Sequence, residues 1–73
     1  MTGTFRGIDY TRGSGLATLF LVDDAGDVNV VHADAGPLFR AIGASGLRPG
    51  DEIEYETDDL GTMAGFTVIG AGA

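Results

Sequence analysis

Turn-forming residues divide this chain into short segments at nearly regular intervals. The turn signals are Arg12 to Gly15, Asp23 to Gly26, Arg48 to Asp51 and Asp58 to Gly61. Short apolar segments separated by such turns are typical of a small antiparallel barrel or sandwich. A chain of 73 residues supports only one hydrophobic core, so we expect a single domain over residues 1–69 and a flexible tail at residues 70–73.

Five of these segments have the composition of β-strands. Leu16 to Val22 is the strongest, because it is apolar at nearly every position, and we expect it to be central. In the first strand, Thr4 to Tyr10, regular alternation would put Phe5 and Ile8 on opposite faces, which predicts a β-bulge near Gly7. The other expected strands are Asp27 to Ala33, Asp51 to Thr57 and Met63 to Ile69.

One short helix is expected between the third and fourth strands. Gly36 to Gly43 has Pro37 near its start, a glycine at its end, and Leu38 and Ile42 one helical turn apart. The OB fold has the same element order, and it binds oligonucleotides or oligosaccharides. The sequence therefore predicts an all-β, five-stranded antiparallel OB-like barrel with one short helix between strands three and four.

The chain is strongly acidic. It has 11 acidic residues against four basic ones, all arginine, and a net charge of −7. Such a surface repels phosphate at ordinary ionic strength, which argues against a general affinity for nucleic acid. The composition is also typical of proteins from salt-loving microbes or GC-rich genomes, and molar salt, with a Debye length of ~3 Å, screens most of that repulsion. Charge alone leaves the class of partner open.

Cysteine is absent, which excludes disulfides, thiolate zinc sites and cysteine nucleophiles. The longest apolar run, Leu16 to Val22, is far shorter than the ~20 residues that span a bilayer. The chain also does not open with a charged and then apolar leader. We therefore expect a cytoplasmic protein that does not enter a membrane.

The segment from Gly3 to Leu16 resembles the opening of the bacterial cold-shock domain without a gap. That family opens Gly-Thr-Val-Lys-Trp-Phe-Asn and continues, two residues later, with Lys-Gly-Phe-Gly-Phe-Ile. Arg6 and Arg12 fall on its two lysines, and Gly13 and Gly15 fall on its two glycines. The spacing is kept throughout this segment.

Later segments are also similar to this family. Asp27 to His32 resembles the motif Asp-Val-Phe-Val-His-Phe, with one extra residue needed to place His32 on the family histidine. Leu47 to Glu56 resembles Leu-x-x-Gly-x-x-Val-x-Phe, and the closing family strand can be laid on Gly61, Ala64 and Val68. The resemblance covers nearly the whole chain and implies a barrel that binds single-stranded RNA or DNA.

The aromatic residues that stack on bases in this family are mostly missing. Gly7 stands at the tryptophan and Ile8 at its aromatic neighbour, while Ser14 and Leu16 stand at two phenylalanines. Stacking is worth ~1–3 kcal/mol per base, so losing four or more stacked bases removes roughly 4–12 kcal/mol. A shared fold would therefore not imply a shared function.

The candidate nucleic-acid-binding residues are Arg6, Arg12, His32, Tyr10 and Phe39. Arg6, Arg12 and His32 could form a small basic island that contacts phosphate, and Tyr10 or Phe39 could stack on a base. A structural interpretation competes in each case. The arginines could instead offset carboxylates in surface pairs worth ~0–1 kcal/mol each, and a lone histidine near a strand end is more often a hydrogen-bonded structural residue.

The fourth expected strand alternates strictly. Ile53 and Tyr55 point inward, while Glu52, Glu54 and Glu56 form a ladder of carboxylates ~6.6–6.8 Å apart on the other face. A solvated face is the usual meaning of such a ladder. A hydrated cation site or a dock for a basic protein is the alternative, although adjacent rungs are too far apart to hold one ion by themselves.

No catalytic constellation is visible. Asp23 to Asp27 lacks the alternating ligands of a calcium loop and is explained by a hairpin turn. Ser14 and Ser45 have neither a nucleophile elbow nor the partners of a triad, and a barrel this small leaves little room for a water-excluding pocket of a few hundred Å³. We therefore expect no enzymatic activity, no cofactor and no metal site.

Two functions remain open from the sequence. The resemblance implies weak, sequence-tolerant binding of single-stranded RNA or DNA. The alternative is a protein-interaction or assembly module that kept the barrel, lost nucleic-acid binding, and meets a protein partner or a second copy through its acidic strand or an exposed edge.

Overall fold

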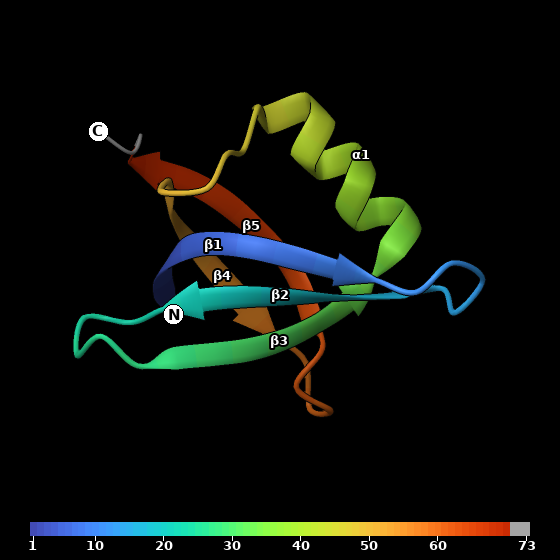
Figure 1. Ribbon diagram of the computed structural model, residues 1–73, viewed down its shortest axis with the longest axis horizontal. Coiled ribbons are helices and arrows are strands. Elements are labelled where there is room, and N and C mark those ends of the chain that lie inside the picture. The colour runs from blue at the N-terminus through green and yellow to red at the C-terminus, as the bar shows by residue number, and fades with distance from the viewer. Residues whose placement is uncertain (71–73) are drawn as a thin grey trace.

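The computed structural model describes residues 1–70 and contains five strands and one helix (Figure 1). The elements are β1 (Thr2–Tyr10), β2 (Leu16–Val22), β3 (Val28–Asp34), α1 (Ala35–Ser45), β4 (Glu52–Thr57) and β5 (Met63–Gly70). Apart from Gly70, the expected flexible tail lies outside the described residues. Within residues 1–70, no helix has the length and apolar character needed to cross a bilayer.

All five strands belong to one antiparallel sheet in the order β3-β2-β1-β4-β5. The sheet is strongly twisted, so that β4 and β5 pass behind β1 and β2 in Figure 1. The two ends of the sheet approach each other at one isolated parallel bridge, between His32 of β3 and Thr62, the residue that precedes β5. The mostly-β class and the single helix between the third and fourth strands are confirmed. The sheet itself is not closed, because β3 and β5 share no ladder beyond this bridge.

The central strand is β1 rather than β2. We expected Leu16–Val22 to be central; its bounds are as predicted and it has a neighbour on each side, but β1 occupies the middle of the sheet. The reason is that Thr2–Thr4, at the start of β1, pairs with Glu52–Glu54 of β4, while the rest of β1 pairs with β2. The same pairing extends β1 two residues upstream of its expected start at Thr4.

A bulge in β1 restores the inward direction of its apolar residues, as predicted. Phe5 pairs with Leu21 whereas Gly7 pairs with Phe20, so β1 has one residue more than β2 at this point. Ile8 thereby returns to the side of the core, against which it is packed and partly buried. The bulge satisfies the hydrophobic pattern that strict alternation would have broken.

Helix α1 is longer than predicted. It covers Ala35–Ser45 instead of Gly36–Gly43, because Gly43 lies inside the helix and the actual stop is Gly46. Gly46 has a φ of 70°, and its backbone N–H donates to the carbonyl of Ile42 at 2.9 Å. This left-handed cap is the usual reason for glycine just beyond a helix.

The core lies between the concave side of the sheet and α1. Ile53 is fully buried and Tyr55 is 5% exposed, as predicted, while Phe66 is only partly buried and packs against the core. The buried apolar residues are Phe5, Ala17, Leu19, Leu21, Val31, Ala33, Ala35, Leu38, Leu47, Ile53, Tyr55 and Met63. Among residues 1–70, no polar or charged residue is buried. The interior is therefore apolar, and the chemistry of this protein lies on its surfaces.

Candidate binding surfaces

The side of β1–β3 that faces away from the core is called the outer face here. Residues directly opposite each other in an antiparallel pair share a face. Phe20 of β2 lies between Gly7 of β1 and Val30 of β3, and Thr18 lies opposite His32 in the next row. These residues alternate along their strands with buried ones, so they point away from the core.

Two adjacent rows of the outer face, Val22 with Val28 and Phe20 with Val30, are apolar, and the polar row of Thr18 and His32 separates them from Leu16. Leu16, Val28 and Val30 are 51%, 61% and 54% exposed. Phe20 and Val22, both partly buried, continue the same surface along β2. A contiguous apolar surface of this kind on a small protein is typical of an interaction site.

Two of the predicted site residues lie on this outer face. Arg6 is exposed and follows the buried Phe5, so it points to the outer side of β1. His32 is exposed on β3, with its Nδ1 atom 3.1 Å from the Thr18 hydroxyl oxygen. Arg12 lies in the exposed loop between β1 and β2. The structure thus places Arg6 and His32 on one face and leaves Arg12 beyond the end of the strands.

Tyr10 and Phe39 lie on the other side of the sheet. Tyr10 is opposite the fully buried Ala17, so its side chain leaves β1 on the side of the core and α1. Its ring meets that of Phe39 on α1 with the centroids 5.3 Å apart and the planes at 83°. The two rings are 41% and 42% exposed. The predicted residues therefore form two separate groups and not one continuous site.

Phe20 is the residue on the outer face that the sequence prediction missed. Because β2 is apolar at nearly every position, its sequence did not single out Phe20 as a surface residue. Phe20 nevertheless alternates with the buried Leu19 and Leu21. A signal was present in the chain, because Phe20 stands between Leu19 and Leu21 in a strand whose side chains alternate between two faces. The ring does not cover Gly7, which stands opposite it, because a Cβ atom placed on Gly7 would meet no atom within 4 Å.

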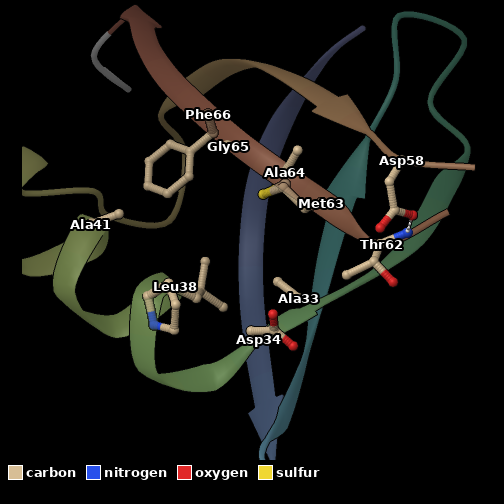
Figure 2. Close-up of a pocket in the computed structure, with 11 residues that line it drawn as sticks. Ala33, Asp34, Leu38, Ala41, Asp58, Thr62, Met63, Ala64, Gly65 and Phe66 are labelled. Carbon is tan, nitrogen blue, oxygen red and sulfur yellow. Dashed lines mark hydrogen bonds between the residues drawn. The ribbon is translucent and has the colours of Figure 1, made fainter. Parts of the chain in front are cut away.

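A groove runs between α1 and β5 (Figure 2) and has a volume of about 310 Å³. The groove is open to solvent, so it does not contradict the expectation that a fold this small leaves little room for a water-excluding pocket. Its lining residues are Ala33, Asp34, Pro37, Leu38, Ala41, Asp58, Thr62, Met63, Ala64, Gly65 and Phe66. Phe66 and Ala41 lie toward one end of the groove, and Asp58 and Thr62 lie toward the other.

The acidic ladder lies on the exposed side of β4, as the alternation of that strand predicts. Glu52, Glu54 and Glu56 are all exposed. Glu56 stands opposite Gly65 of β5, and Glu54 stands opposite Thr67. A second hollow of about 340 Å³ is lined by residues of both strands.

The acidic segment between β2 and β3 is a hairpin turn, as predicted. The Oδ1 atom of Asp23 accepts hydrogen bonds from the backbone N–H groups of Ala25 and Asp27 at 3.0 and 2.9 Å. Gly26 has a φ of 86°, which residues with a side chain rarely adopt. The hydrogen bonds of Asp23 and the positive φ of Gly26 explain why these two residues occur in this turn.

The chain matches no protein-family model, no curated protein and no solved structure. Its function is therefore argued from the surfaces described above.

Proposed function

We propose that this protein is a non-catalytic binding module built on an OB-like barrel, and that its outer face binds a protein partner. The barrel is supported by the sheet order and by the parallel His32–Thr62 bridge between the two ends of the sheet. A sheet closes into a barrel only when its two outer strands come together, and this bridge lies where they would meet.

The apolar outer face is the observation that carries the proposed function. Val28 and Val30 lie on the outermost strand and are more than half exposed. From Val28 to Val31 the edge of β3 pairs with no other strand, and it lacks several of the usual features that prevent pairing with another chain. It contains no lysine and no proline, and its ladder with β2 runs without a register shift. Burying these valines against a partner would remove apolar surface from water at ~25 cal/mol per Å².

A single substitution tests the outer face. Val30→Lys adds a charge there, and Leu60→Lys is the matched control because Leu60 is 91% exposed in the turn between β4 and β5. Each protein is immobilised and exposed to a lysate of its source cells, and light scattering at low and high salt measures self-association. We expect partners, or a defined oligomer, that Val30→Lys loses and Leu60→Lys retains. If both variants retain the same bound proteins, or if the wild type stays monomeric and captures nothing, the proposal fails.

Weak binding of single-stranded RNA or DNA is the second candidate function. One observation favours it, namely that Arg6, Phe20 and His32 share the outer face, which supplies two cationic or ionisable groups and one aromatic ring. A phosphate contact and one stacked base are what such a trio can provide. The net charge of −7 opposes this function at low salt.

A labelled single-stranded oligonucleotide titrated at several salt concentrations tests the second candidate. We expect binding that weakens with salt, with a slope that falls by ~0.7 in Arg6→Ala if that residue contacts one phosphate. Phe20→Ala should remove ~1–3 kcal/mol if its ring stacks on a base. Absence of binding at low salt would exclude this function. Chemical shifts at Tyr10 and Phe39, away from the outer face, would show whether these predicted residues take part.

A further inference from the structure

We propose that the groove between α1 and β5 binds an extended segment of a partner protein that carries a basic side chain. Apart from Asp34, which stands opposite Leu16 of the outer face, the residues that line this groove lie off that face, so the inference does not rest on the function proposed above. Three observations carry it: the open edge of β5, the apolar lining of the groove, and two aspartates among its lining residues.

The wall formed by β5 is a strand edge. Side chains alternate between the two faces of a strand, so a run of consecutive residues along one pocket brings backbone as well as side chains to its wall. The consecutive residues Met63 to Phe66 all line this groove. Strand β5 ends the sheet and has a ladder with β4 alone. Its other edge therefore offers N–H and C=O groups to an added strand.

The groove leaves room for a peptide backbone beside the edge of β5. Ala64 and Gly65 are the smallest residues along this part of β5, and Ala41 lies on α1 beside the ring of Phe66 (Figure 2). A Cβ atom placed on Gly65 would meet no atom within 4 Å. Leu38 and Met63, which are 4% and 7% exposed, form the apolar base of the groove. An extended segment could thus pair with β5 and place alternate apolar side chains on this base.

The charges at the groove select the partner. Asp34 and Asp58 both line it, and both are exposed at the residue level. Asp34 precedes α1, but its carboxylate makes no capping hydrogen bond to the helix. One carboxylate oxygen of Asp58 accepts from the N–H groups of Leu60 and Thr62, at 2.9 Å each, which fixes the side chain in place. Two carboxylates attract a lysine or arginine and repel phosphate, so this geometry favours a basic protein segment over a nucleic acid.

Short blocked peptides test this inference with the full chain. The probe is a peptide of alternating valine and threonine with a lysine at one end, made in both orientations. Two control peptides carry glutamate in place of the lysine, or N-methyl groups on alternate backbone nitrogens. Backbone amide chemical shifts of the labelled protein report where each peptide binds. We expect shifts at residues 62–66 and 38–41 with the lysine peptide, and much weaker binding of both control peptides.

Variants of the protein separate the groove from other surfaces. Ala41→Trp fills the groove and should abolish binding, while Ala44→Trp, on the same helix but outside the lining, should leave it unchanged. Asp34→Asn should weaken the lysine peptide by about 1.5- to 5-fold, as expected for one exposed charge pair, and Asp59→Asn is its control. Thermal melting of each variant verifies folding. If Ala41→Trp does not fold, Asp34→Asn and the N-methylated peptide still decide.

Three results would overturn the inference. The first is the absence of any shift with either orientation of the lysine peptide. The second is equal binding of the lysine and glutamate peptides, which would remove the role of Asp34 and Asp58. The third is full binding of the N-methylated peptide, because a ligand held only by apolar contacts needs no backbone hydrogen bonds to β5.

Discussion

The ring of Tyr10, at the end of β1, meets the ring of Phe39, on the exposed flank of α1, edge to face at a centroid distance of 5.3 Å. This contact joins the helix to the central strand of the sheet. In this geometry the edge of one ring meets the face of the other, so the contact covers one face of one of the two rings that the sequence offered for base stacking.

A double-mutant cycle measures this contact. Tyr10→Leu and Phe39→Leu each keep an apolar side chain, so the coupling between them reports the ring–ring term. We expect a coupling of about 0.5–1.5 kcal/mol in the free energy of urea unfolding. Tyr10→Leu combined with Leu60→Ala serves as the control and should be additive. A Tyr10–Phe39 coupling no larger than that of the control would show that the contact does not stabilise the fold.

Two glycines of α1 should respond to alanine in opposite directions. Gly43 lies inside the helix with open space where a Cβ atom would be, so Gly43→Ala should stabilise the fold by about 0.5–1 kcal/mol. Gly46 has a φ of 70° and caps the helix, so Gly46→Ala should destabilise it by about 1 kcal/mol. Chemical denaturation of the two variants measures both effects. The same sign for both would contradict the positions of the helix interior and its cap.

The core should be far more sensitive to truncation than the outer face. Ile53 is fully buried, so Ile53→Ala should cost about 2–5 kcal/mol, a large part of the stability of so small a domain. Val28 is 61% exposed, and Val28→Ala should change the free energy of unfolding by less than about 0.5 kcal/mol. Circular dichroism during thermal melting compares the two. Similar losses in both variants would mean that Val28 is buried in solution, as in an oligomer.

Salt should stabilise this protein. With a net charge of −7, repulsion among carboxylates opposes folding, and molar KCl reduces the Debye length to ~3 Å. We therefore expect Tm to rise with KCl, and to rise less in the double variant Glu54→Gln and Glu56→Gln, which removes two rungs of the acidic ladder. Differential scanning calorimetry across a KCl series measures this. A Tm that stays flat in the wild type would refute the interpretation of the composition as a salt adaptation.

The order and identity of the elements could be predicted from the sequence because their signals are local. Gly26 and Asp23 specify a hairpin turn through their own backbone angles and hydrogen bonds. Alternation along β4 placed Ile53 and Tyr55 in the core, and the failure of alternation along β1 revealed the bulge near Gly7. Each of these signals involves residues only a few positions apart, so no knowledge of the fold was needed to use it.

Which surfaces those elements form was decided only by the tertiary structure. Pairing of Thr2–Thr4 with Glu52–Glu54 made β1 central, and the bulge and register put Arg6 and His32 on a face that Tyr10 and Phe39 do not share. The groove exists because α1 lies next to β5, although β4 separates these two elements along the chain. Such pairings depend on the fit of distant segments around one core, and local propensity carries no information about that fit. The sequence by itself therefore determined the strands, turns and helix, and their packing determined where a partner can bind.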